Sequence, residues 1–523
     1  MNGTAEEVPE TKQSKPRELA RRGSRKKTME ETKMGKQKIS ASEADGVNYK
    51  RAKTWRIALA SMNGAGGMCF YILMTYASYV ANAGYGIATA VVGIILTVTR
   101  IFDGITDPII AVLIDKTNTK FGKIRLWIFG GWLWESLAIV MMFVWASGKG
   151  HGVPLFVLLY LFYVIGYTMN NVAGQIIGPV MVNDPRQRPL VGVWGTVYNY
   201  FVPMILSMVI AMVLLPRYNN EYSVEMLKAT SLVCIGVSFI LVLLACIGVS
   251  ADDKQENFVG ISASGDKEPV KVKDMLACLK GNRPLQMYII AAASDKVAQQ
   301  TASQAVVNTM LFGILIGNIQ LGTMVTVITM LPSIIFAIAG GKYAGKHGSK
   351  EANVTWTRIC LIVAVISVIF CSLTDMRQIT VSIVPTVIYC LLLLALNGSK
   401  MCVTTASGAM MSDVIDYELA RTGNYMPAVV TATYSFIDKL ISSFGALIAT
   451  GAVALIGYTT TMPQPTDAST TPIKVMTMLL YYGLPIIGWI CTLVAMKFTP
   501  LSKETMITVQ KEIAEKKAAT AQK

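Results

Sequence analysis

The chain has 523 residues, of which 53% are hydrophobic and only 15% are charged, and its mean hydropathy is +0.48. This composition is too apolar for a soluble protein of this size and indicates a bilayer environment. The formal net charge of +15 could suggest a nucleic-acid ligand, but the surplus lies in the chain ends and on one set of loops. We therefore expect no nucleic-acid partner, and the lipid bilayer as the surrounding medium.

Apolar runs recur along the chain, and each is about 20 residues long, the length that a helix needs to cross a hydrocarbon core of roughly 30 Å. Lipid offers backbone N–H and C=O groups no hydrogen-bond partner, so the spans must be helices. The pattern predicts an all-α membrane protein with twelve spans at approximately 56–81, 87–114, 126–147, 154–181, 190–215, 229–250, 285–311, 318–341, 354–374, 379–411, 426–458 and 473–497.

A polar stretch at residues 251–284 divides these spans six and six, into an N-terminal bundle at 54–250 and a C-terminal bundle at 285–497. The polar ends, 1–53 and 498–523, are expected to be tails, and the first is expected to be mostly disordered rather than a signal peptide. A faint repeat between the loops after spans two and eight indicates two related halves. Such halves place solute and ion sites near the membrane midplane, where the two meet.

Lysine and arginine are concentrated on alternate loops, after spans two, four, six and eight. By the positive-inside rule, these loops and both termini are cytoplasmic. We expect a multi-pass protein of the cell membrane that works as a monomer.

Span two carries two acids four residues apart, Asp103 and Asp107, which therefore share one face of a helix, with Arg100 nearby. A charge at the bilayer centre costs roughly 2.5 kcal/mol or more, so such residues face a partner or a wet cavity. One interpretation is an ion-pair lattice with Arg100 that holds helices together. The other, which we favour, is a site for a hard cation or a proton.

The run RIFDGITDPIIAVLIDKTNTKFGKIRLW at residues 100–127 resembles the signature of the glycoside-pentoside-hexuronide:cation symporters, a branch of the major facilitator superfamily typified by melibiose permease. GYTMNN at 166–171 and DVIDYELARTG at 413–423 match the same family. The resemblance covers residues from about 55 to 500. It implies two six-helix bundles and a secondary active transporter that carries a sugar together with a cation.

The resemblance also implies residue roles. The family's cation-site positions match Asp103, Asp107 and Thr168. Lys439 matches the family's lysine at that site, and we assign coupling to Lys439 and to Arg100, which lies beside the acids. The implied coupling ion is Na⁺, Li⁺ or H⁺, with no other cofactor and no resident metal, and the threonine favours Na⁺.

The family's sugar-binding positions are not retained. Its two sugar-directed aspartates fall at Gly64 and Asn171, its arginine at Thr196 and its tryptophan at Gln175. Neutral amides and hydroxyls can still bond sugar hydroxyls, though more weakly than carboxylates do. We therefore expect solute contacts from Asn63, Asn171, Gln175 and Thr196.

Four further charged residues lie inside predicted spans. Lys400 is expected in the solute cavity, and with Lys439 it would favour an acidic sugar such as a hexuronide. Asp295 is a candidate solute contact, whereas Lys296 is as consistent with a structural bridge as with solute binding. Glu135 closely follows Trp132 and Trp134 and is either a membrane-edge anchor or a cavity residue. Trp489 is expected at the membrane interface or facing lipid.

Two clusters are candidates for gating. The loop after span two contains an acid, a glycine and basic groups that resemble the superfamily's loop motif and could clamp helix ends in one conformation: Asp115, Gly122, Lys123 and Arg125. The end of span ten carries Asp413, Asp416 and Arg421.

An enzyme is the main alternative class. The two histidines, His151 and His347, are predicted in loops on opposite sides, and neither HExxH nor GxSxG occurs. We therefore expect no catalytic residue and no enzyme. Within the transporters, the alternatives are a symporter of a non-sugar solute such as a lysolipid, and an uncoupled uniporter.

Overall fold

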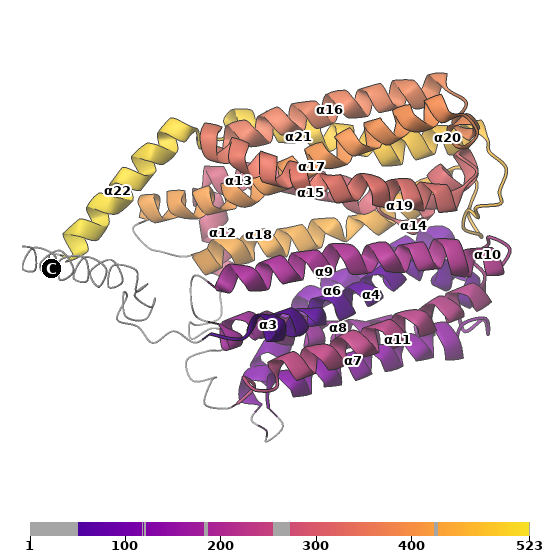
Figure 1. The fold of residues 1–523 in the computed structure, drawn as a ribbon, viewed down its shortest axis with the longest axis horizontal. Coiled ribbons are helices and arrows are strands. Elements are labelled where there is room, and N and C mark those ends of the chain that lie inside the picture. Colours follow the sequence, from indigo (N-terminus) through magenta and orange to yellow (C-terminus); the bar gives the residue numbers. More distant parts are fainter. Residues whose placement is uncertain are drawn as a thin grey trace, which may run out of the picture.

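The structure is a computed structural model that describes residues 51–521 except for 118, 120–121, 183–186, 255–271 and 423–426. The described part of the chain is helical and contains no strand. Most of the expected N-terminal tail and of the central loop lies outside the described residues. Figure 1 shows long helices that run side by side, with the C-terminal helix projecting beyond one end.

Six helical segments form the first bundle, and several of them are broken into consecutive pieces. They are α3 (Thr54–Ala60) with α4 (Met62–Met74), α5 (Ala77–Tyr79) and η1 (Val80–Gly84); α6 (Thr89–Lys116); α7 (Ile124–Ile139) with η2 (Val140–Trp145); α8 (Gly152–Met181); α9 (Arg188–Val209) with η3 (Ile210–Leu214) and α10 (Leu215–Arg217); and α11 (Val224–Val249).

Six more form the second bundle. They are α13 (Arg283–Ala302) with α14 (Ala305–Asn308) and η5 (Thr309–Leu315); α15 (Ile319–His347); α16 (Ser349–Leu373), followed by the short η6 (Met376–Thr380); α17 (Ile383–Thr422); α18 (Pro427–Ser442) with α19 (Phe444–Leu455); and α20 (Thr471–Met478) with η7 (Leu479–Gly483) and α21 (Leu484–Phe498). Outside the bundles, α12 (Val272–Gly281) precedes the second bundle and α22 (Lys503–Ala521) follows it.

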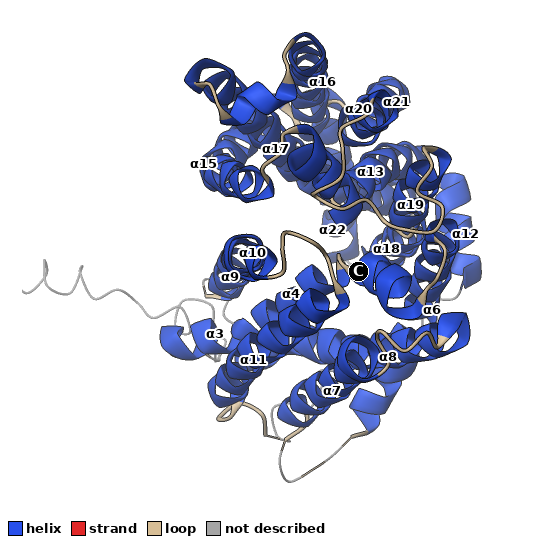
Figure 2. Cartoon of the chain, turned by 90° about the vertical axis from the view of Figure 1, so that its right-hand side faces the viewer, coloured by secondary structure: helices blue, strands red, loops and turns tan. Residues whose placement is uncertain are grey.

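These twelve segments are consistent with the twelve predicted spans, and the predicted all-α fold is confirmed (Figures 1 and 2). Among the described residues, nine helices are individually long and apolar enough to cross a membrane. The second half of α6 carries Arg100, Asp103 and Asp107. Its retention as one continuous helix through that charged stretch agrees with a functional role.

Local side-chain caps fix where several helices begin. Ser223 accepts a hydrogen bond from the Met226 amide at the start of α11. Asn282 and Asn318 accept the third amide of α13 and α15 in the same way, each at 2.8 Å. A polar side chain at this position satisfies one of the amides that a helix start leaves without a partner.

The two bundles meet along two seams. α6 packs against α18 and α19, and α9 packs against α15. The ends of the bundles are called here the α22 end and the far end, which lies on the side of α10 and α20 in Figure 1.

The segment between α19 and α20, residues 456–470, contacts the first bundle at the far end. The Asn82 side chain donates to the Thr460 carbonyl at 2.7 Å and accepts from the Met462 amide at 3.0 Å. The Tyr79 hydroxyl donates to the Pro463 carbonyl at 2.8 Å. Because Asn82 and Tyr79 belong to the first bundle, this segment ties the bundles together at the far end.

The seam between α6 and α19 depends on Gly93. A Cβ atom at this position would lie 2.9 Å from the Leu447 Cα atom and would also overlap the Thr450 side chain. Backbone atoms cannot move aside as a flexible side chain can, so only glycine allows this approach.

We expect Gly93→Val to separate the two bundles at the far end, because overpacking of this kind costs roughly 1–3 kcal/mol where α6 and α19 are in contact. The measurement is the distance between spin labels at exposed far-end positions 149 and 377, one in each bundle, with the native cysteines replaced. The label distance should lengthen in Gly93→Val. Gly451→Val, on α19 with nothing within 4 Å of its Cβ, is the matched control, and equal distances in the two variants would contradict this role for Gly93.

Candidate functional site

α6 carries the predicted cation-site acids near its middle. Asp103 and Asp107 lie one helical turn apart in the continuous helix Thr89–Lys116. The side chains of Arg100, Asp103 and Asp115 lie outside the described residues, so Asp107 is the acid whose surroundings the structure defines.

Asp107 forms an ion pair with Lys439 of α18. The two side chains are 31% and 37% exposed, and the pair joins α6 of the first bundle to α18 of the second. The structure therefore brings together two residues that the sequence analysis assigned to cation binding and to coupling, although 332 positions separate them.

Thr168 reaches the same region from α8. Its hydroxyl is fully buried and lies 3.0 Å from the Thr106 hydroxyl on α6, one residue before Asp107. The combination of a carboxylate and hydroxyl oxygens is the chemistry that Na⁺ and other hard cations require. In this arrangement the Lys439 ammonium is paired with the Asp107 carboxylate.

The first bundle contains a cavity of about 320 Å³ whose largely apolar lining includes several polar side chains. Its polar wall consists of Asn63 on α4, Glu135 on α7, Asn170, Asn171 and Gln175 on α8, and Asn199 on α9. Three of the six predicted solute contacts, Asn63, Asn171 and Gln175, thus line one cavity.

Thr196 does not line this cavity. The α9 residues that do, Val191, Gly195 and Asn199, are spaced four apart and form one helix face. Thr196 follows Gly195 and is therefore rotated by about 100° from that face, and it is exposed. The structure does not place Thr196 with the three amide contacts, and its role in solute binding stays a prediction.

Glu135 was left open between two interpretations, and the structure decides between them. It is 1% exposed and lines the cavity, so the membrane-edge interpretation is wrong. The flanking Trp132 and Trp134 side chains instead pack on Phe239 and Phe162.

Lys400 and Asp295 form a separate cluster inside the second bundle. The Asp295 carboxylate accepts a hydrogen bond from the Trp489 indole at 3.1 Å. The Lys400 ammonium lies 5.8 Å from the centre of the same indole ring, a cation–π distance. Trp489 is 1% exposed, so its expected place at the membrane interface is wrong.

Lys296 lies 4.0 Å from the Asp438 carboxylate and bridges α13 and α18. This contact favours the structural-bridge interpretation. Asp438 directly precedes Lys439, so the bridge also supports the helix that presents the coupling lysine.

Comparison with known proteins gives a consistent family. The profile described as MFS/sugar transport protein matches residues 60–503. The chain belongs to this family. The match confirms the expected relationship to the glycoside-pentoside-hexuronide:cation symporters, and it identifies the protein as a transporter of the major facilitator superfamily.

Curated relatives are distant but extend over most of the chain. The isoprimeverose transporter of Lactiplantibacillus pentosus is 22% identical, over 88% of this chain and 92% of its own. YagG of Escherichia coli (strain K12), named as a candidate glycoside/cation symporter, is 20% identical, over 87% of this chain and 93% of its own.

Among solved structures, a bacterial homologue of the human lysosomal transporter Spinster, in an inward-facing and unoccupied conformation, has a TM-score of 0.56. It is 12% identical and covers 88% of this chain and 99% of its own. At that identity the likeness shows the fold alone.

The loop between α6 and α7 is held by hydrogen bonds to Asp253, an acid that the sequence analysis missed. Asp253 accepts hydrogen bonds from the amides of Lys123, Ile124 and Arg125, at 2.8–2.9 Å, and from the Arg125 guanidinium at 3.1 Å. Asp253 follows α11, so it caps the start of α7 from a neighbouring helix.

Gly122 makes this capping possible. Its φ of +92° lies in the left-handed region, and a Cβ there would lie 2.9 Å from the Asp253 carbonyl oxygen and overlap its carboxylate. Gly122, Lys123 and Arg125 therefore act together with Asp253, and the predicted clamp of helix ends is in this structure a contact within the first bundle.

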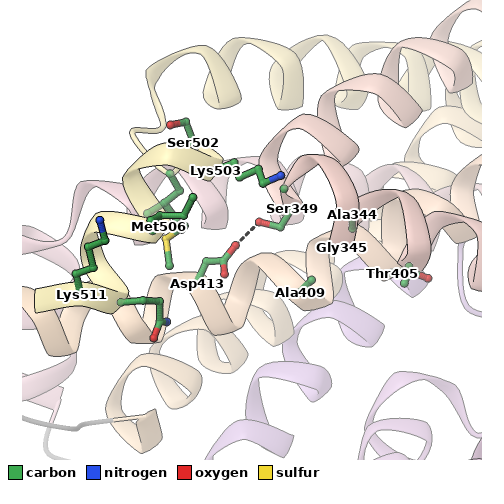
Figure 3. A pocket seen from close by; sticks show the side chains of 15 residues that line it. Ala344, Gly345, Ser349, Thr405, Ala409, Asp413, Ser502, Lys503, Met506 and Lys511 are labelled. Carbon is green, nitrogen blue, oxygen red and sulfur yellow. Dashed lines mark hydrogen bonds between the residues drawn. The ribbon is translucent and has the colours of Figure 1, made fainter. Parts of the chain in front are cut away.

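The predicted gate residues of α17 each have a different partner. Asp413 accepts a hydrogen bond from Ser349, and Gln510 of α22 donates to Asp416 at 2.7 Å. Arg421 forms an ion pair with Glu418 at 2.8 Å. Figure 3 shows Asp413 and Ser349 in a cavity of about 720 Å³ that α15, α17 and α22 enclose. This cavity is larger than the one in the first bundle, but it lies at the α22 end and away from the Asp107–Lys439 pair.

We expect Asp253→Ala to lower the free energy of unfolding by about 1–2 kcal/mol, because three amides and Arg125 lose a charged acceptor. Thermal unfolding of the purified protein measures the loss. Lys254→Ala, at the exposed next position, is the control. An Asp253→Ala protein as stable as the control would show that this cap does not hold α7 in place.

Proposed function

We propose that the chain is a cation-coupled symporter of a neutral glycoside or short oligosaccharide. The observation that carries this proposal is the Asp107–Lys439 ion pair, which places an exchangeable carboxylate at the seam between the two bundles. A cation that takes the place of Lys439 on Asp107 would change which charges attract each other across the seam. This exchange is a direct way to link cation binding to the movement of one bundle against the other.

The amide-lined cavity supports a sugar as the solute. Asn63, Asn171 and Gln175 supply both donors and acceptors, which suits hydroxyl groups and does not suit an acyl chain. Relatives named as isoprimeverose and glycoside/cation transporters agree with this choice. A lysolipid is therefore the weaker alternative.

We place a neutral glycoside ahead of a hexuronide. The acidic version needs Lys400 and Lys439 to present positive charge to the solute. In the structure Lys439 is paired with Asp107, and Lys400 lies beside Trp489, whose indole is bonded to Asp295. Both lysines thus already have anionic or aromatic partners.

We propose that the protein lies in the cell membrane with both termini cytoplasmic. The α22 end then faces the cytoplasm, because α6, α8, α11 and α15, the helices that precede the basic loops in the sequence, all end there. The far end, where residues 456–470 link the two bundles, then faces the outside. The coupling ion is Na⁺ or H⁺, and Thr168 favours Na⁺.

We expect uptake into proteoliposomes to require an ion gradient. One monovalent cation moving through 100 mV contributes roughly 2.3 kcal/mol. At about 1.4 kcal/mol per tenfold, this supports roughly fifty-fold accumulation of a neutral solute. Asp107→Asn should abolish accumulation while leaving exchange of labelled solute measurable. The readout is the steady-state level of radiolabelled glycosides, with and without an ionophore.

Asp375→Asn, on the far-end loop before η6, is the matched control and should accumulate solute normally. Coupling is disproved for any solute whose steady-state level in wild type is the same with and without the ionophore.

A further inference from the structure

A small cavity lies on the seam between the two bundles and is called here the seam chamber. Its volume is about 30 Å³, enough for about one or two water-sized particles and too small for a sugar. The lining is mainly polar, and among the described residues no lysine, arginine, aspartate or glutamate lines it. Its polar groups come from the ends of α4, α13 and α18: Thr75, Gln300, Ser303, Gln304, Ser442 and Ser443.

The hydroxyl groups around the seam chamber have already used their hydrogens. Four of them donate to carbonyls one turn earlier on their own helices, at 2.6–3.1 Å: Thr75, Ser303, Ser442 and Ser443. A serine or threonine hydroxyl has one hydrogen, so only its oxygen lone pairs remain for an occupant. The Gln304 amide nitrogen also donates to its own helix, at 3.1 Å, and its oxygen remains an acceptor. The chamber is therefore rich in acceptors and suits an occupant that is a cation or a donor.

Helix ends add a negative field at the same place. Thr75 is the C-cap of α4 and Ser303 is the C-cap of α13, while α18 is interrupted at Ser443 before α19 begins. The C-terminal end of a helix carries roughly half a negative elementary charge, and interrupted spans of transporters bind cations at such ends. α4 and α13 belong to spans one and seven, which hold corresponding places in the two halves. The field therefore favours a cation over a neutral donor.

Close packing brings these helix ends together. A Cβ atom at Gly445 of α19 would lie 2.9 Å from the Gln300 carbonyl carbon, so glycine allows α19 to approach the end of α13. Thr97 of α6 donates to the Ser443 carbonyl at 3.0 Å and joins the first bundle to the same site. An occupant of the seam chamber thus contacts both bundles.

The ligand atoms decide which cation fits. The hydroxyl and amide oxygens named above are neutral, whereas the Asp107 site offers a carboxylate. Neutral oxygens can replace the hydration shell of a weakly hydrated ion, as carbonyl oxygens do for K⁺ in channel filters, but they offset poorly the dehydration of smaller or divalent cations. Lys439 lies one turn before Ser442, and its ammonium is paired with Asp107, so it leaves no unpaired positive charge beside the chamber.

We propose that the seam chamber is a second cation site, which binds K⁺ through neutral oxygens of both bundles. It lies between the Asp107–Lys439 pair and the far end, because Ser442 follows Lys439 on α18 and α19 continues toward residues 456–470. Since the ends of α4 and α13 both contribute, K⁺ stabilises this arrangement of the two bundles. The site goes beyond the proposed symport and does not depend on it.

The test uses the purified full-length protein in detergent, with neither solute nor gradient. Thermal unfolding is followed while KCl or NaCl replaces choline chloride at constant ionic strength, and binding of radioactive Rb⁺, a close analogue of K⁺, is measured on the same samples. K⁺ should raise the unfolding temperature of wild type. The double variant Asp107→Asn with Lys439→Gln removes the acid site and leaves no unpaired charge, so it should still respond to K⁺ and no longer to Na⁺.

Ser303→Ala and Ser442→Ala each remove one acceptor oxygen from the chamber. Each should raise the K⁺ concentration needed for half of the effect about three- to tenfold, and the two together by more than about tenfold. Ser250→Ala is the matched control, because Ser250 is the exposed C-cap of α11 and its hydroxyl makes the same bond, to the Ile247 carbonyl at 2.7 Å. It should respond to K⁺ as wild type does. The unfolding curve in choline chloride shows that each variant is folded.

Three results overturn the assignment. If K⁺ stabilises wild type no more than choline does and Rb⁺ does not bind, the seam chamber holds water. If the folded variant without both serine hydroxyls responds to K⁺ as wild type does, K⁺ binds elsewhere. If the variant without Asp107 and Lys439 loses its response to K⁺, that ion belongs to the acid site. None of these results touches the proposed symport, because the test measures no uptake.

Discussion

The ion pair between Asp107 and Lys439 is the interaction on which the arrangement of the two bundles depends. It joins α6 to α18 across the seam, with each side chain about two-thirds buried. Both charges have lost much of their hydration, so removal of either partner leaves a costly charge rather than a neutral gap. A mobile cation is the natural substitute for Lys439, because it supplies the missing charge without tethering α18.

The rest of the structure is consistent with movement about this seam. At the far end, the close approach at Gly93 and the hydrogen bonds to residues 456–470 hold the bundles together. Caps within a bundle, such as Asp253 on the start of α7, keep each bundle rigid. Rigid bundles that move as units about the seam are what rocking of one half against the other requires.

Much of the fold and part of the site could be predicted from the sequence. Hydropathy and length place the twelve spans, and the four-residue spacing of Asp103 and Asp107 places both on one helix face. Contacts between distant spans leave no local signal, which explains why the cap by Asp253 was missed and why Trp489, which bonds Asp295, was misplaced. The face that a helix turns inward is equally hidden when most of its residues are apolar, as Thr196 on α9 illustrates.

The most direct test of the account is whether Lys439 and the coupling cation compete for Asp107. Thermal stability of wild type, Asp107→Asn and Lys439→Gln is titrated with Na⁺, Li⁺ and H⁺. The ion that stabilises wild type should act on Lys439→Gln at a concentration about five- to tenfold lower, equivalent to about 1 kcal/mol for a part-exposed pair. It should leave Asp107→Asn unaffected. If Lys439→Gln needs more of that ion than wild type, or no longer responds to it, Lys439 supports the cation site instead of competing for it, and the account is contradicted.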